Sequence, residues 1–104
     1  MAETQVLYSI CEYLAYKKDL LFWRNNTLPV FSVKNNSYIR MPKFSRTGLP
    51  DIIVVKNGKF IGLEVKTDKG KPSPNQIEFG IDCVKAGGEY HVVRSIEDVQ
   101  KIGL

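Results

Sequence analysis

The chain has 104 residues, of which 43% are hydrophobic and 25% charged, the balance expected of one globular domain. No apolar stretch approaches the roughly 20 residues that span a bilayer, which argues against a membrane protein. The net charge of +4 is uneven. Residues 34–71 hold nine basic and three acidic residues, or +6, and the rest sums to −2, which suggests a polyanionic partner or an ordinary solvated lysine-rich surface.

The first half of the chain reads as a helix, a strand and a long irregular segment. Apolar residues at spacings of three and four predict an amphipathic helix over residues 3–17. Residues 20–24 have strand composition. Residues 25–47 combine Asn pairs and prolines with short β-type pieces, which indicates a loose hairpin or a long loop.

The second half predicts a hairpin, a helix, a strand and a short final helix. Two apolar runs flank Asn57-Gly58, which indicates a hairpin over residues 51–67. Ser73 is a helix N-cap with Pro74 at the first helical position, and Gly87-Gly88 ends that helix after residue 86. Residues 89–94 alternate like a strand, and residues 96–102 form a last helix. The expected fold is therefore α/β or α+β, with a small mixed sheet between helices.

The Asn-Gly turn fixes the register of the hairpin. With Asn57 and Gly58 as a two-residue turn, facing residues have numbers that sum to 115, so Asp51 faces Glu64. Their Cβ atoms should then lie about 4.5–5.5 Å apart, and Lys66 should point to the same face as Glu64. Both faces of the hairpin are apolar, which predicts central strands that are covered on both sides.

Two opposed carboxylates at the end of a hairpin are unfavourable unless something compensates their charge. Like charges destabilise a sheet and drive one acid toward protonation. A divalent cation such as Mg²⁺ between Asp51 and Glu64 would remove the conflict. The alternative is that both acids are frayed strand ends in solvent, with Lys66 as a salt-bridge partner.

The residues around these acids resemble those of a known nuclease family. Pro50-Asp51 followed by Glu64-Val65-Lys66 fits the P-D…(D/E)-x-K signature of a large nuclease superfamily, and Gln76 follows ten residues after the lysine. Together with the stretches 3–6, 13–14, 22–27 and 48–53, the sequence resembles the VRR-NUC family (virus-type replication-repair nucleases) in its stand-alone form. The resemblance runs from about residue 3 to residue 94, and the segment 27–47 departs from the compact loop expected there.

The resemblance implies a restriction-endonuclease-like core and metal-dependent hydrolysis of phosphodiester bonds. In the family pattern, Mg²⁺ or Mn²⁺ is bound by Asp51, Glu64 and the backbone carbonyl of Val65. Lys66 positions or activates the attacking water and stabilises charge on the phosphate. Small stand-alone members resemble Holliday junction resolvases, which implies a homodimer that acts on branched or duplex DNA.

Several further residues have two interpretations. An acid on the first helix often joins the metal site in this family, and Glu3 matches its place better than Glu12, although Glu3 is also a favourable charge at a helix N-terminus. Gln76 either completes a capping box with Ser73 or contacts the water or phosphate in the active site. The basic residues that we expect to bind nucleic acid are Arg24, Arg40, Lys43, Arg46, Lys69 and Lys71.

The function expected from the sequence is that of a divalent-metal-dependent DNA endonuclease formed by one domain, residues 1–104. The alternative is a DNA- or RNA-binding protein on the same fold with weak or no activity. Cys11 and Cys83 have no metal-type spacing, and the N-terminus lacks the basic start of a signal peptide. We therefore expect reduced thiols in a soluble protein of the cytoplasm, in a bacterial or phage-infected cell.

Overall fold

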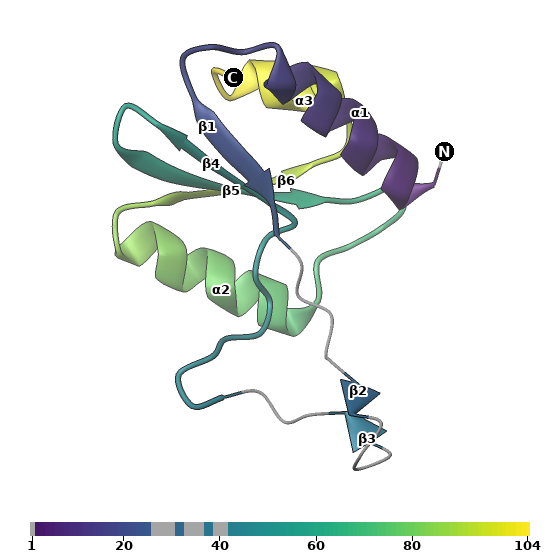
Figure 1. The fold of residues 1–104 in the computed structure, drawn as a ribbon, viewed down its shortest axis with the longest axis vertical. Helices are drawn as coiled ribbons and strands as arrows, with labels where there is room; N and C mark the ends of the chain where they lie inside the picture. The colour runs from purple at the N-terminus through teal and green to yellow at the C-terminus, as the bar shows by residue number, and fades with distance from the viewer. Residues whose placement is uncertain (1, 26–30, 33–36, 39–41) are drawn as a thin grey trace.

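The structure is a computed structural model that describes residues 2–25, 31–32, 37–38 and 42–104. Its centre is a four-stranded sheet with strand order β1-β4-β5-β6 (Figure 1). β1 (Leu21–Arg24), β4 (Ile52–Lys56) and β5 (Lys59–Val65) are antiparallel neighbours, and β6 (Glu89–Val93) is parallel to β5. This is the mixed sheet that the sequence predicts.

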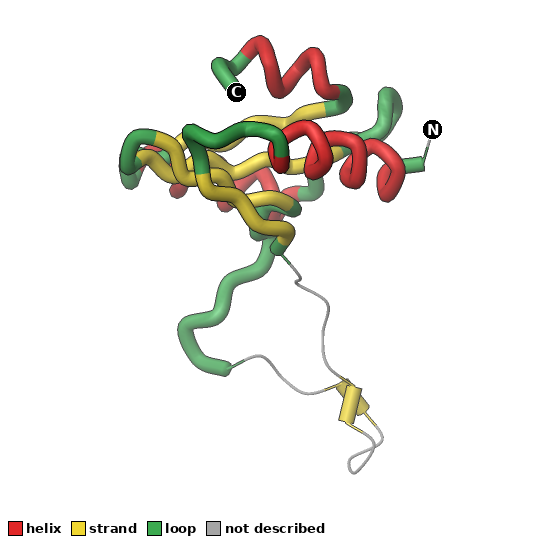
Figure 2. Tube along the Cα trace, turned by 45° about the horizontal axis from the view of Figure 1, so that its top comes forward, coloured by secondary structure: helices red, strands yellow, loops and turns green. Residues whose placement is uncertain are grey.

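Helices cover both faces of the sheet, as Figures 1 and 2 show. α1 (Glu3–Ala15) and α3 (Ile96–Lys101) lie on one face and contact each other. α2 (Pro74–Lys85) lies on the opposite face, where it packs against β6 and provides the crossover between the two parallel strands. The expectation of a restriction-endonuclease-like core, with a small mixed sheet flanked by helices, is confirmed.

The hairpin has the predicted turn and register. Asn57 and Gly58 have φ angles of 53° and 75°, the left-handed values that a type I′ turn requires. The paired residues run from Lys56 with Lys59 to Ile52 with Leu63, and each pair sums to 115. β4 and β5 are the two central strands of the sheet.

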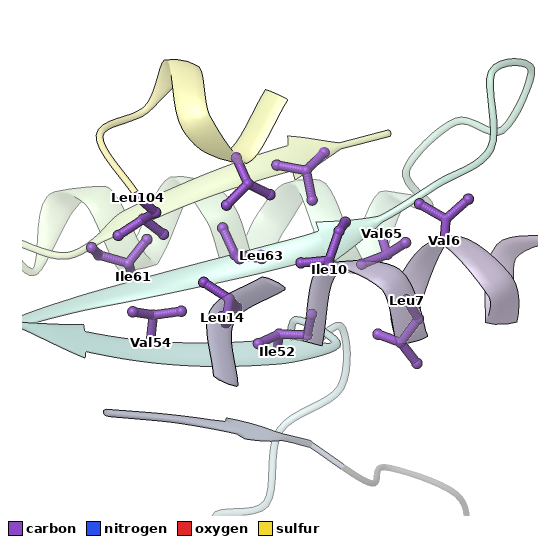
Figure 3. Close-up of a cluster of buried hydrophobic side chains, with 12 residues drawn as sticks. Val6, Leu7, Ile10, Leu14, Ile52, Val54, Ile61, Leu63, Val65 and Leu104 are labelled. Carbon is purple, nitrogen blue, oxygen red and sulfur yellow. The ribbon is translucent and has the colours of Figure 1, made fainter. Parts of the chain in front are cut away.

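The hydrophobic core lies between the sheet and α1 (Figure 3). The helix contributes residues at the spacings that place side chains on one face, and the strands contribute every second residue. The buried side chains from these elements are Val6, Leu7, Ile10, Leu14, Ile52, Val54, Ile61, Leu63 and Val65. This packing holds the end of β5 rigidly against the beginning of α1.

The irregular segment contains two short strands. β2 (Phe31–Ser32) and β3 (Ser37–Tyr38) pair antiparallel in a separate two-stranded sheet, in line with the predicted loose hairpin. Arg40, one of the expected nucleic-acid contacts, lies outside the described residues. Among the described helices, none is both long and apolar enough to cross a membrane.

Candidate active site

Asp51 lies where the β4–β5 ladder ends. The last paired residues are Ile52 and Leu63, so Asp51 stands one residue beyond the ladder instead of forming the expected pair with Glu64. Its Oδ2 accepts a hydrogen bond of 2.8 Å from the backbone N–H of Val65. The preceding Pro50 packs over Gly62, because a Cβ at that glycine would lie only 2.8 Å from the proline ring. These contacts fix the aspartate against the end of β5.

Glu64 is a buried acid on a central strand. Only 1% of its side chain is exposed. Its Oε1 accepts a hydrogen bond of 2.9 Å from Gln76 Nε2 and lies 3.8 Å from Lys66 Nζ. Its Oε2 is buried and accepts no hydrogen bond within the described part of the chain. A buried carboxylate oxygen that no donor satisfies is costly in its charged form, so the protonated form is favoured.

The surroundings of Glu64 make it a weak acid in the metal-free protein. Burial, followed by hydrogen-bond contact with the Asp51 carboxyl group and by its charge, raises the pKa of Glu64 to about 9. Lys66 opposes this shift, and the charge of Glu3 adds to it. At neutral pH the metal-free site therefore holds a proton that a bound cation would displace.

Gln76 forms the capping box that the sequence predicts and also reaches Glu64, whereas its contact with a water or a phosphate stays a prediction. Its Oε1 accepts from the backbone N–H of Ser73 at 2.8 Å, and Ser73 Oγ accepts from the Gln76 N–H at 3.3 Å, which completes the capping box at the start of α2. At the same time its Nε2 donates to Glu64. The helix cap thereby orients the carboxyl group of the buried acid.

Lys66 points into the site from the end of β5. Its side chain is only 14% exposed, and its backbone N–H donates to Val93 O on β6. The following turn folds back over the lysine, because a Cβ at Gly70 would be 3.5 Å from its aliphatic stem. The carboxylates and the lysine thus come together at one end of the central strands.

Arg94 holds that turn in place and was not expected from the sequence. Its Nη1 donates to the carbonyl oxygens of Thr67 and Gly70, the latter at 2.7 Å. Its backbone N–H donates to Asp98 Oδ2 at 2.8 Å. The sequence does not indicate this role, because Arg94 lies more than 20 residues from the turn and belongs to no motif.

Tyr90 is a second residue that the sequence did not suggest. Its hydroxyl is buried beneath α2 and has no hydrogen-bond partner in the described residues. Burial, together with the charges of Glu64 and Asp51, raises its pKa. The hydroxyl therefore stays protonated at neutral pH.

Glu3 lies beside the site, whereas Glu12 does not. Glu3 in the first turn of α1 lines a pocket of about 140 Å³ with Asp51, Val65 and Arg24. Glu12 is exposed nine residues later, and nine steps of about 100° place it on the opposite side of the helix. Of the two acids, Glu3 is the one that the structure brings to the pocket.

The other basic residues lie in three places around this end of the sheet. Arg24 ends β1 at the pocket, where it donates to the Tyr8 hydroxyl at 3.3 Å. Lys69 and Lys71 are exposed in the loop between Lys66 and α2. Lys43 is exposed in the loop that precedes Gly48, and Arg46 in the same loop forms an ion pair with Asp82.

The donor atoms at the site suit a hard cation. Asp51 and Glu64 offer carboxylate oxygens, Val65 offers a main-chain carbonyl, and the Glu64 oxygen without a partner is available for coordination. Within the described residues, no group of three or more acidic, histidine or cysteine side chains is close enough to bind a metal together. Two carboxylates completed by a carbonyl and water are sufficient for Mg²⁺, which keeps several of its waters.

Comparison with known proteins identifies the fold. No protein-family model and no curated protein matches the sequence. One solved structure, described as a VRR_NUC domain, superimposes with a TM-score of 0.65 and 24% sequence identity, over 96% of this chain and 91% of that chain. The shared arrangement extends over almost the whole of both chains, so this protein has the fold of a VRR_NUC domain.

Proposed function

We propose that this protein is a divalent-metal-dependent DNA endonuclease that hydrolyses phosphodiester bonds and prefers branched DNA, such as a Holliday junction. The observation that carries the proposal is the buried carboxyl group of Glu64, with one oxygen held by Gln76 and the other without a partner. Burial of such a group is too costly to be a feature of an ordinary strand end. On the fold of a VRR_NUC domain it is best explained as a metal ligand.

Mg²⁺ or Mn²⁺ would be held by Asp51, Glu64 and the carbonyl of Val65. Glu3 would add negative charge to the pocket, in keeping with its effect on the pKa of Glu64. The bound cation supplies charge neutralisation at the scissile phosphate and lowers the pKa of a water molecule. Binding requires Glu64 to lose its proton, so affinity for the cation should rise with pH.

Lys66 would stabilise charge on the phosphate, and Gln76 would orient the carboxyl group of Glu64. The ammonium group of Lys66, held in a mostly buried position beside Glu64, would stabilise the negative charge that grows on the phosphate as water attacks phosphorus. The water oxygen would bond to phosphorus and release one proton to solvent, while the bond to the leaving oxygen breaks and that oxygen takes up a proton from solvent. Gln76 keeps Oε1 of Glu64 occupied, which directs the other oxygen toward the ligand.

The surroundings of the site suit a DNA backbone. The N-terminus of α2, which begins at Pro74 beside Gln76, favours a phosphate through the helix dipole. Arg24, Lys69, Lys71 and Lys43 would contact further phosphates. Arg46 would do so only after it leaves Asp82, which competes for its guanidinium group.

A homodimer would place two such sites on one junction. Three apolar side chains on the outer face of α2, Ile77, Ile81 and Val84, are each more than half exposed. They line an apolar pocket of about 510 Å³ together with Tyr90 and Val92 of β6, which pairs only with β5 in the described part of the chain. We expect a second copy to cover this face. Light scattering should give a dimer that Ile81→Glu dissociates. Tyr16→Glu, at the exposed residue that follows α1, should leave the dimer intact. A monomeric wild-type protein would contradict this part of the proposal.

The function is tested by a cleavage panel. A four-way junction, a flap, a bubble, a duplex and a single strand of matched length are incubated with Mg²⁺, Mn²⁺ or EDTA. We expect cutting of the branched molecules with either metal, none in EDTA, and none by Glu64→Gln. Undiminished cutting in EDTA would refute the metal site. Binding without cutting of any substrate, or a preference for RNA in competition, would support the alternative of an inactive nucleic-acid-binding protein.

A further inference from the structure

Phe44 is the most exposed of the large apolar side chains in the described part of the chain. Its side chain is completely exposed, whereas the next, Tyr16, reaches 86%. Its φ angle of 68° lies in the left-handed region, which is rarely adopted by an aromatic residue. The surrounding fold must maintain both features at a cost in free energy, and such outliers concentrate at functional positions.

The loop that presents Phe44 is fixed to α2. Gly48 has a φ of 77°, and a Cβ there would lie 2.2 Å from the carbonyl oxygen of Asn75, so the loop touches the helix backbone. Arg46 forms an ion pair with Asp82, and its guanidinium carbon lies 5.5 Å from the centre of the Phe79 ring. Phe44 itself lies inside a turn closed by the Ser45 N–H and the Pro42 carbonyl at 3.2 Å. The ring of Phe44 is therefore exposed to solvent on a loop that is held against α2.

The sequence around Phe44 is basic, although Glu78 and Asp82 of α2 line a pocket together with Arg46 of its loop. Residues 20–50 contain five basic residues and no Asp or Glu, a charge of +5, and the flanking acids are Asp19 and Asp51. Lys43 directly precedes the phenylalanine. An exposed aromatic ring within a basic segment matches the way in which proteins hold unpaired nucleotides, with bases stacked on rings and phosphates on cations.

We propose that Phe44 stacks on an unpaired base of the DNA substrate while Lys43 contacts its backbone. Phe44 precedes Asp51 by seven positions, so their Cα atoms lie at most about 25 Å apart, less than one turn of B-DNA. The contact would explain a preference for branched over fully paired DNA. It rests on the proposed function only in that DNA is the ligand, because stacking requires neither metal nor cleavage.

Binding in EDTA tests this contact separately from catalysis. The probes are a forked DNA with 2-aminopurine in its unpaired arm and a fully paired duplex of the same length. The variants are Phe44→Ala, Phe44→Leu, which keeps an apolar side chain without a ring, and Phe44→Trp. Tyr16→Ala is the matched control, because Tyr16 is also an exposed aromatic residue and is followed by two lysines. Thermal melting checks that every variant folds.

We expect Phe44→Ala and Phe44→Leu to weaken binding of the fork about 5- to 100-fold and to abolish the change in 2-aminopurine fluorescence. Duplex affinity should not change, Phe44→Trp should retain fork binding, and Tyr16→Ala should match the wild-type protein. Unchanged fork affinity in Phe44→Leu would overturn the proposal, and so would an equal loss on fork and duplex or dissociation of the dimer. If these variants bind normally but wild-type protein still cuts DNA, only the stacking contact fails; if stacking is seen without any cutting, only the nuclease function fails.

Discussion

Glu64→Gln should remove a pH dependence of stability that the buried acid imposes on the metal-free protein. The pKa of Glu64 is raised from 4.5 to about 9 by burial and by Asp51. Between these two values the folded state keeps a proton that the unfolded state has lost. The free energy of unfolding must therefore fall as pH rises. One additional proton bound by the folded state corresponds to about 1.4 kcal/mol per pH unit, or at most about 3 kcal/mol between pH 6 and pH 8.

Glutamine cannot ionise, yet it retains an oxygen for Gln76 and almost the same volume. Urea unfolding in EDTA at pH 6, 7 and 8 should show a steeper fall for the wild-type protein than for Glu64→Gln, and the variant should be the more stable one at pH 8. Groups common to both proteins cancel in this difference. Glu12→Gln, at an exposed glutamate of α1, should follow the wild-type protein. Equal slopes for wild type and Glu64→Gln would show that Glu64 does not keep its proton, and would refute the reasoning.

The wild-type protein and Glu64→Gln also test whether a cation binds at Glu64. A ligand that binds only the folded state stabilises it by RT ln(1 + [L]/Kd), about 3 kcal/mol at a hundredfold excess over Kd. Mg²⁺ should therefore raise the free energy of unfolding of the wild-type protein, and more strongly at pH 8 than at pH 6, because Glu64 must lose its proton. Glu64→Gln should gain little. An equal gain in both proteins would place the bound cation elsewhere.

Three further substitutions probe the support of the site. Gly62→Ala should displace Pro50, whose ring lies 2.8 Å from the new methyl position, and destabilise the protein by about 1–3 kcal/mol in urea unfolding; a neutral effect would contradict the close packing. Arg94→Ala removes the two bonds to the turn after Lys66, so steady-state cleavage should show a lower kcat with little change in KM. Tyr90→Phe removes a buried hydroxyl without a partner, so the free energy of unfolding should stay level or rise by up to about 1 kcal/mol; a clear loss would reveal a partner for the hydroxyl.

The sequence predicted the central sheet because its strongest signals are local. Asn57-Gly58 determines the turn, and the turn determines every pair as far as Ile52 with Leu63. The next pair that this register predicts, Asp51 with Glu64, does not form. The hydrogen-bonded pair after Ile52 with Leu63 would join Pro50 to Val65, and proline has no N–H for the ladder. The Asp51 carboxylate takes the Val65 N–H instead, and this change brings the side chain over the end of β5.

The sequence did not predict the partners of Arg46 and Gln76, because these contacts join residues that are far apart in the chain. Arg46 was expected to be free for phosphate, but Asp82, 36 residues away on α2, binds it. Gln76 was given two competing roles because a sequence pattern shows its neighbours in the chain and not its neighbours in space. The structure shows that one amide can serve the cap with its oxygen and Glu64 with its nitrogen.

Single-turnover cleavage of a four-way junction by Lys66→Ala, with Lys69→Ala as the matched control, tests the proposed nuclease most directly. Lys66 lies against Glu64 in the site, whereas Lys69 is exposed in the next turn. With Mn²⁺ present, Lys66→Ala should cut at least about 100-fold more slowly than the wild-type protein and bind the junction with similar affinity in EDTA. Lys69→Ala should bind more weakly and cut at nearly the wild-type rate once saturated. Cleavage by Lys66→Ala at the wild-type rate would contradict the proposed active site.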